Sequence, residues 1–163
     1  MTPDLLPEVL ADHLDRLYRA AWAMCGSRED AEDLVQETFA RVLAKKRTIA
    51  SDQDALPYLL RVLRNTFVSS LRTRSRRPKT APIEDAEPRL AASEAGSPTA
   101  VLAAREVFAA IAALPEDQRD VVAAVDVAGL TYAEAADTLG VPTGTIMSRL
   151  YRGRARVADA VGA

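Results

Sequence analysis

The chain has 163 residues, of which 48% are apolar and 5% aromatic, so it can form one medium or two small domains, and its abundant alanine and leucine favour an all-α fold. The formal net charge of −2 excludes a bulk polycation. With Cys25 as the sole cysteine and His13 as the sole histidine, an intrachain disulfide is excluded and a structural zinc site is disfavoured.

The first part of the chain predicts two helices. Residues 7–25 carry an apolar stripe at helical spacing, and we expect His13 on the surface of this helix. Ser27 and Asp30 have the spacing of an N-cap residue and its reciprocal partner, so a second helix is expected to begin there. Its inward-facing residues are expected to include Leu43.

Acidic residues crowd the first turns of the second helix: Glu29, Asp30, Glu32 and Asp33. The helix dipole favours negative charge at this end, which explains the cluster better than metal binding or acid–base catalysis does. Protein binding is the stronger functional alternative, because Asp33, Gln36 and Glu37 are expected to form a polar ridge beside the exposed side of Phe39.

Pro57 predicts the start of a third helix, which runs into the basic segment 61–79. This segment contains seven arginine or lysine residues and no acid, so it would repel itself without an anionic partner. If about half of these cations meet phosphates, binding should weaken steeply with salt. The alternative is a solvated helix end followed by a flexible basic tail.

Residues 80–97 are rich in proline and acids, with little periodicity, and we interpret them as a flexible acidic linker. The linker divides the chain into two small helical domains, residues 1–79 and 98–163. Ser97 and Pro98 have the pattern of a helix cap and first turn. Another helix is expected from Pro115 to Gly129.

Residues 130–157 predict a helix-turn-helix. Thr131 and Glu134 have capping-box spacing, and Gly140 can end the first helix in a left-handed conformation. Tyr132 is expected on the apolar face of that helix, and Ile146, Leu150 and Val157 on the inner face of the second helix. The second helix carries four arginines between Met147 and Arg156 and no acid, whereas a solvated helix face usually interleaves both signs. The alternative is a two-helix corner of an ordinary helical core.

Three motifs, in this order, resemble the extracytoplasmic-function (ECF) sigma factors, the smallest bacterial transcription initiation factors. The region 2 helix that docks on the polymerase clamp has its counterpart in DAEDLVQETFARVL (30–43). The segment that reads and melts the −10 element has its counterpart in PYLLRVLRNTFVSSLRTRSRR (57–77). Region 4, which binds the −35 element, has its counterpart in ALPEDQRDVVAAVDVAGLTYAEAADTLGVPTGTIMSRLYRGRARV (113–157).

The resemblance implies three groups of contact residues. Core RNA polymerase would be contacted by Asp33, Leu34, Gln36, Glu37 and Phe39. The −10 element would be contacted by Asn65, Thr66, Ser69, Arg72, Arg74, Arg76 and Arg77, with Phe67 and Ser70 as further candidates. Asn65 would lie beside the loop that captures a flipped base, and the arginines would bind backbone phosphates. The −35 element would be contacted by Thr145, Ser148, Arg149, Arg152 and Arg154. Met147 stands where many relatives have a basic residue, so one polar DNA contact is missing or replaced by an apolar one.

The function expected from this resemblance is a promoter-specificity subunit and not an enzyme, so we expect no catalytic residue, metal or cofactor. Its partners would be the clamp of the largest polymerase subunit, the flap region of the second, promoter DNA and an anti-sigma protein. No signal pattern and no run of about 18 apolar residues occurs, so we expect a cytoplasmic protein that makes no membrane contact by itself. The chain ends soon after Arg156, so no added C-terminal domain is expected.

Two other functions remain open at this point. One is a self-sufficient helix-turn-helix repressor or activator, which would bind duplex DNA tightly without polymerase, usually as a dimer. The other is a nuclease that uses the acids between Glu29 and Asp33.

Overall fold

The computed structural model describes residues 7–45, 55–76 and 97–163, and every regular element in them is helical. The N-terminal part contains α1 (Pro7–Asp12), α2 (Leu14–Cys25), α3 (Arg28–Lys45) and α4 (Ala55–Arg76). The C-terminal part contains α5 (Pro98–Ala112), α6 (Glu116–Val122), the π-helical turn η2 (Ala123–Val127), α7 (Tyr132–Leu139) and α8 (Thr143–Val161). The all-α prediction is confirmed, while the predicted linker lies outside the described residues except for Ser97. None of the described helices has the length and hydropathy needed to cross a membrane.

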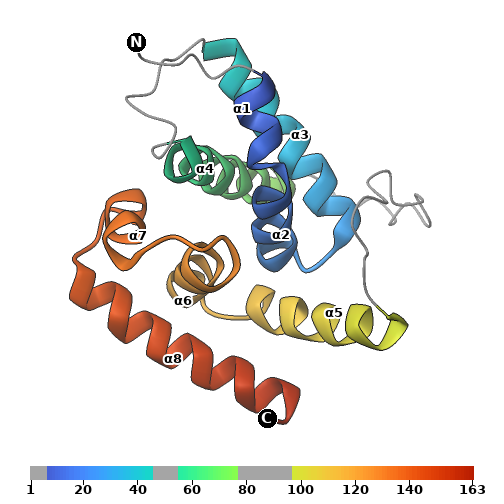
Figure 1. Ribbon diagram of the computed structural model, residues 1–163, viewed down its shortest axis with the longest axis vertical. Coiled ribbons are helices and arrows are strands. Elements are labelled where there is room, and N and C mark those ends of the chain that lie inside the picture. The colour runs from blue at the N-terminus through green and yellow to red at the C-terminus, as the bar shows by residue number, and fades with distance from the viewer. Residues whose placement is uncertain (1–6, 46–54, 77–96) are drawn as a thin grey trace.

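The N-terminal and C-terminal helices lie directly against one another. In Figure 1, α1 to α4 form the upper part of the molecule and α5 to α8 the lower part. Helix α2 packs on α3 and α4 in its own half and on α5 and η2 in the other, while α4 packs on α7. Buried apolar residues from both halves, including Leu17, Leu63, Val121 and Ile146, form one continuous core. The two predicted helical domains are therefore in contact in this structure.

Side-chain caps begin several helices where the sequence predicts them. The Thr131 hydroxyl accepts a hydrogen bond from the Glu134 backbone N–H at 3.1 Å, and the Glu134 carboxylate accepts one from the Thr131 N–H at 2.9 Å. The Ser27 hydroxyl accepts a bond from the Asp30 N–H at 3.2 Å, and Ser97 caps α5 in the same way. These bonds satisfy N–H groups that have no partner inside the helix.

The structure corrects four details of the sequence analysis. The prediction of one helix over residues 7–25 is wrong at His13, where φ is −105° and ψ is 1°, and where the N–H bonds to the carbonyl three residues back at 3.2 Å, as in a 3₁₀ turn. His13 is half-buried and therefore only partly on the surface. Helix α4 begins at Ala55, two residues before Pro57. Leu43 and Tyr132 are exposed, since Leu43 lies in the last turn of α3 and Tyr132 is the first residue of α7, where fewer neighbours cover a side chain.

Candidate nucleic-acid interface

Helices α7 and α8 form the predicted helix-turn-helix. Gly140 ends α7 with a φ of 70°, a left-handed conformation that glycine adopts without steric cost, and Pro142 is the N-cap residue of α8. Ile146 and Leu150 are buried on the inner side of α8, which packs on α6 and α7. The outer side of α8 is left exposed, which is the geometry of a recognition helix that enters the major groove.

A close helix crossing holds α8 against α6. Gly153 of α8 is buried, and a Cβ added there would come within 2.7 Å of the Val122 Cγ2 atom. Since Val122 is itself buried and β-branched, its side chain has little room to rotate away. Gly153 was not among the predicted structural residues, although a glycine inside a helical pattern indicates a close approach of this kind.

The residues predicted to contact the −35 element differ in exposure and in their contacts within the protein. Ser148 and Arg152 lie exposed on α8, and Arg152 forms no ion pair with any residue in the described part of the chain. Thr145 is half-buried, and its carbonyl accepts a hydrogen bond from the Ser148 hydroxyl at 3.2 Å. Arg149 is half-buried, with its Nε atom 3.7 Å from a carboxylate oxygen of Asp117.

Arg154 is held by an acid of its own domain. Its Nε and Nη2 atoms donate to the two carboxylate oxygens of Asp126 at 2.9 and 2.6 Å. This hydrogen bonding raises the pKa of the Arg154 guanidinium, which is ionised in any case. The fork that would bind a phosphate or a guanine is therefore occupied in this structure and ties α8 to η2.

Residues predicted to meet the −10 element lie along α4 with different degrees of exposure. Asn65, Ser69 and Arg72 are exposed, and Arg74 is exposed with its Nη2 atom 3.3 Å from Asp30. Thr66 does not fit a DNA-contacting role in this arrangement, since it is fully buried. The Thr66 hydroxyl donates to the Val62 carbonyl at 2.7 Å, a bond within the helix backbone. Arg76 is the last residue of α4, and Arg77 lies outside the described residues.

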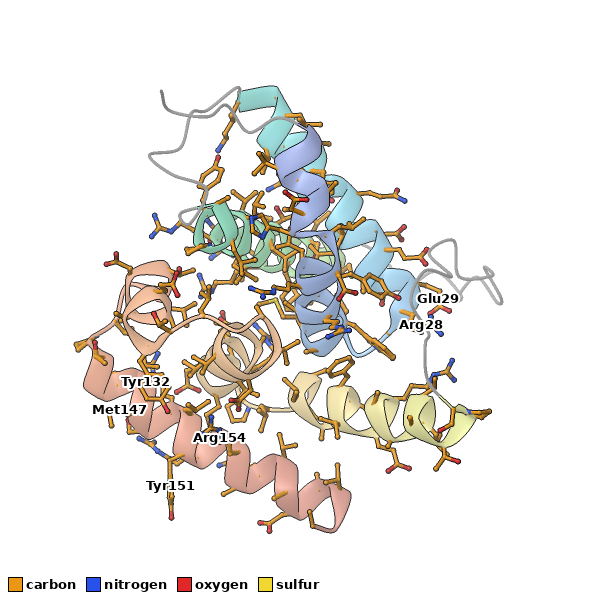
Figure 2. The ribbon with its side chains drawn as sticks, in the orientation of Figure 1. Arg28, Glu29, Tyr132, Met147, Tyr151 and Arg154 are labelled. Carbon is orange, nitrogen blue, oxygen red and sulfur yellow. The ribbon has the colours of Figure 1, made fainter. Side chains whose placement is uncertain are left out.

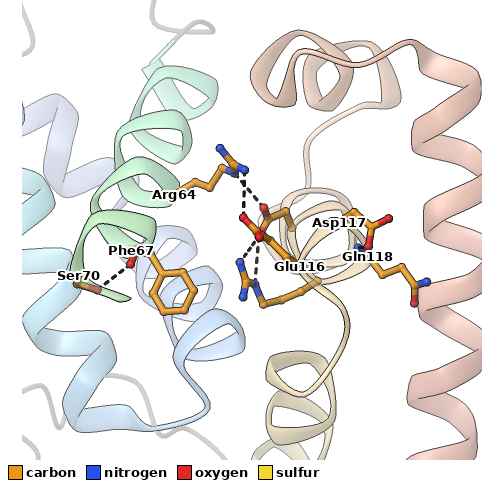
Figure 3. Close-up of polar contacts among 8 residues, drawn as sticks. Arg64, Phe67, Ser70, Glu116, Asp117 and Gln118 are labelled. Atoms are coloured by element: carbon orange, nitrogen blue, oxygen red, sulfur yellow. Dashed lines mark hydrogen bonds and ion pairs between the residues drawn. The ribbon is translucent and has the colours of Figure 1, made fainter. Parts of the chain in front are cut away.

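An ion network joins the two halves of the molecule on the other side of α4. Arg64 of α4 donates to Asp120 of α6 at 2.9 Å and to Glu116 at 3.4 Å (Figure 3). Arg119 donates to the same Asp120 carboxylate at 2.9 and 3.1 Å, and its guanidinium carbon lies 4.7 Å from the centre of the Phe67 ring in α4. Asp120 thus bridges two arginines, one from each half, and the sequence analysis did not predict this contact.

The predicted polymerase surface lies on α3. Asp33, Gln36 and Glu37 are exposed there, as expected of a polar ridge, and Glu37 pairs with Arg41 at 3.0 Å. Phe39 is half-buried against the core. Leu34 is buried and contributes mainly to the core, so the accessible part of this surface is polar.

The acid cluster at the start of α3 shows no metal-binding arrangement in the residues that the structure describes. Glu32 is buried, whereas Glu29 and Asp33 are exposed. Nearby, burial and the charge of Asp30 raise the pKa of the Cys25 thiol to about 12, so this cysteine is a weak nucleophile.

The fold and this interface define a class of protein: two helical domains in contact, the first with an arginine-bearing helix and the second with a helix-turn-helix. Comparison with known families is consistent with this division. Residues 9–77 match the family described as Sigma-70 region 2, and residues 104–157 match Sigma-70, region 4.

Similar proteins agree with the family matches. The ECF RNA polymerase sigma factor SigE of Mycolicibacterium smegmatis is 36% identical over 157 residues, which cover 93% of this chain and 60% of SigE. The ECF RNA polymerase sigma factor EcfG of Rhodopseudomonas palustris is 35% identical, over 96% of this chain and 84% of EcfG. The sigma factor RpoE of Bartonella quintana, solved in complex with the anti-sigma factor NepR, superposes with a TM-score of 0.66 at 27% identity, covering 96% of this chain and 93% of that one. The chain belongs to the ECF sigma factors.

Proposed function

We propose that this chain is a promoter-specificity subunit that binds core RNA polymerase and directs transcription initiation at promoters with defined −35 and −10 elements. The observation that carries the proposal is the outer face of α8, where Ser148 and Arg152 are exposed on the second helix of a helix-turn-helix. In the major groove, an arginine fork on this face can bind guanine bidentately or neutralise a phosphate.

Helix α4 would supply the second DNA contact. Asn65 and Ser69 present short polar side chains on its exposed surface, and Arg72 and Arg74 follow at the end where the basic segment begins. A flipped base needs a pocket with hydrogen-bonding groups and no catalytic residue, because melting is driven by capture of unstacked bases. We therefore assign strand opening to this helix and propose that the chain is not an enzyme.

Binding both elements requires the two halves to separate. The −35 and −10 elements are named for positions about 25 base pairs apart, which is roughly 85 Å along B-form DNA. In this structure α4 and α6 lie within hydrogen-bonding distance through Arg64 and Asp120. We infer that the structure is a closed form, and that docking of the N-terminal domain on the polymerase clamp and of the C-terminal domain on the flap region holds the open form.

An anti-sigma protein is the partner that we propose for the closed form. The Bartonella quintana relative was solved with such a protein, NepR. Such a protein would hold the two domains together and cover the polar ridge on α3, and so keep the chain from binding polymerase. The chain and its anti-sigma protein would both be located in the cytoplasm.

A run-off transcription assay tests this function. Core polymerase with the chain should initiate at promoters that core polymerase alone ignores, in a genome-scale screen of template fragments. A gel shift with duplex DNA separates the proposal from a self-sufficient regulator, which would bind tightly without polymerase. No new start site in the presence of the chain, together with tight binding of free duplex, would contradict the proposal.

The α3 surface has its own test. Replacing both Asp33 and Gln36 with alanine should weaken polymerase binding, measured by co-purification, and leave binding of isolated −35 duplex intact. Glu106→Ala, which removes an exposed acid from α5, is the matched control and should leave both unchanged. Equal loss of polymerase and duplex binding in the double variant would show that α3 is needed only for folding.

A further inference from the structure

Three large apolar side chains are exposed together on the helix-turn-helix. Tyr132 at the start of α7 is 38% exposed, and Met147 and Tyr151 of α8 are 54% and 78% exposed. They line a shallow groove with Leu150, Arg154 and Ala155. Figure 2 shows Met147 and Tyr151 on the outer side of α8, with Tyr151 pointing away from the rest of the molecule.

This apolar patch lies on the outer side of α8, the side that we propose enters the major groove. Met147 and Tyr151 are four residues apart, so their side chains lie one above the other on the same helix face. Ser148 and Arg152 follow each of them by one position and form a parallel polar row. Ile146 is buried on the other side of α8, and Leu150, which also lines the groove, is buried. The apolar row and the polar row would therefore enter the major groove side by side.

The chemistry of the major groove offers one apolar partner for this row. Base edges there present hydrogen-bond donors and acceptors, and thymine alone adds an exposed C5-methyl group. Methionine is uncharged, unbranched and flexible, so it can follow a methyl group whose position varies with DNA shape. The surrounding charge favours DNA over a protein as the occupant, because Arg152 and Arg156 are exposed beside the patch and form no ion pair within the described part of the chain. The other two arginines of this helix face, Arg149 and Arg154, are paired with Asp117 and Asp126.

We propose that Met147 and Tyr151 read thymine methyl groups in the −35 element and so determine part of the promoter specificity of this chain. The inference rests on the proposed function, since it requires α8 to enter the major groove. The inference concerns only the base pairs that face this row. At those base pairs Met147 and Tyr151 would favour the methyl group of thymine, whereas a basic side chain in their place would favour a hydrogen-bond acceptor or a phosphate.

The test replaces thymine with deoxyuridine, which removes only the C5-methyl group. A preferred −35 sequence is first selected from a randomised library with polymerase that carries the full chain, and each thymine is then replaced singly. At the one or two positions that face the patch, deoxyuridine should weaken binding by about three- to fivefold, because the complex loses the favourable burial of one methyl group. At all other positions it should have no effect.

Variants of Met147 and Tyr151 test whether these two side chains cause the deoxyuridine effect. Met147→Ala and Tyr151→Ala should lose the discrimination between thymine and deoxyuridine at those positions. Met147→Arg should lose it as well and steepen the dependence of log affinity on log salt by about one unit. Leu102→Ala is the matched control, since it removes an equally exposed apolar side chain from α5 and should keep the discrimination.

The outcomes are distinguishable. Promoter-specific binding with no deoxyuridine effect at any position overturns the thymine inference and leaves the proposed function standing. If Met147→Ala and Tyr151→Ala weaken capture of polymerase or of an anti-sigma protein while the deoxyuridine effect persists, the patch is a protein-docking surface and the inference is wrong. Absence of any promoter-specific binding by polymerase with the chain overturns both. Because both side chains are largely exposed, the variants should unfold at the wild-type temperature, and the deoxyuridine series on the unaltered protein needs no variant.

Discussion

Asp120 is the acid on which two arginines of different helices converge, and replacing it should measurably weaken the contact between the two halves. Asp120→Asn keeps the shape of the side chain and removes its charge. Its own side chain is 4% exposed and that of Arg119 is 8% exposed, so the substitution leaves a buried guanidinium without a counter-charge. Breaking a buried ion pair in this way costs about 3–5 kcal/mol.

The expected magnitude is lower than that range because one partner is accessible to water. The Arg64 side chain is 35% exposed and keeps Glu116 at 3.4 Å, so solvent and a second acid compensate part of the loss. We expect Asp120→Asn to lower the free energy of unfolding by about 2–3 kcal/mol. With a urea dependence of about 2 kcal/mol per molar, the midpoint should fall by about 1 M.

Urea unfolding followed by circular dichroism measures this shift, and Asp117→Asn is the control. Asp117 lies three residues earlier on α6, its side chain is 49% exposed, and its carboxylate is 3.7 Å from Arg149. A surface pair of this kind contributes less than about 1 kcal/mol. A double-mutant cycle with Arg64→Ala should show coupling of at least about 0.5 kcal/mol across the two domains. Equal midpoints for Asp120→Asn and Asp117→Asn, with no coupling to Arg64, would show that Asp120 does not hold the two halves together.

Three further predictions follow from single sites. At pH 9 an ordinary thiol is about half ionised, whereas Cys25, with its pKa of about 12, is about 0.1% ionised. Iodoacetamide should therefore alkylate Cys25 a few hundredfold more slowly in the folded protein than in urea. Equal alkylation rates would contradict the burial of this thiol. Thr131→Ala removes the capping box and should cost about 1 kcal/mol in urea unfolding, while Thr99→Ala, which removes an exposed threonine that caps no helix, should change stability little. If Arg152 contacts a phosphate, Arg152→Ala should reduce the slope of log affinity against log salt for −35 binding by about one unit; if Arg152 contacts a base edge, the variant should lose about 1–3 kcal/mol of binding at one base pair. Gel shifts at several salt concentrations distinguish the two outcomes. If neither effect is seen, Arg152 lies outside the interface.

Local features of the fold could be predicted because the information lies within a few residues. The capping box at Thr131 and Glu134 and the left-handed Gly140 each depend on a stretch of four to five residues, and the structure confirms them. The inner face of α8 was predictable for the same reason, since Ile146 and Leu150 recur at helical spacing. The break at His13 was not, because no proline or glycine marks it.

Contacts between distant parts of the chain could not be predicted in this way. Arg64 and Asp120 are 56 positions apart, and nothing in either segment specifies that they meet. The same holds for Arg154, whose pairing with Asp126 depends on how α8 crosses η2. An arginine-rich segment has the same composition whether its cations face DNA or an internal acid. Composition alone therefore could not separate Arg152, which has no ion pair within the described residues, from Arg154, which is exposed but paired with Asp126.

Permanganate footprinting of one selected promoter shows whether this chain makes core polymerase open DNA, because permanganate oxidises thymines only where the strands have separated. With core polymerase and this chain together, we predict reactive thymines in one continuous stretch that begins at the −10 element, and none with either component alone. Asn65→Ala should reduce this reactivity more than it reduces initial binding of the closed duplex. A promoter that stays unreactive with both components present, or that becomes reactive with polymerase alone, would contradict the account.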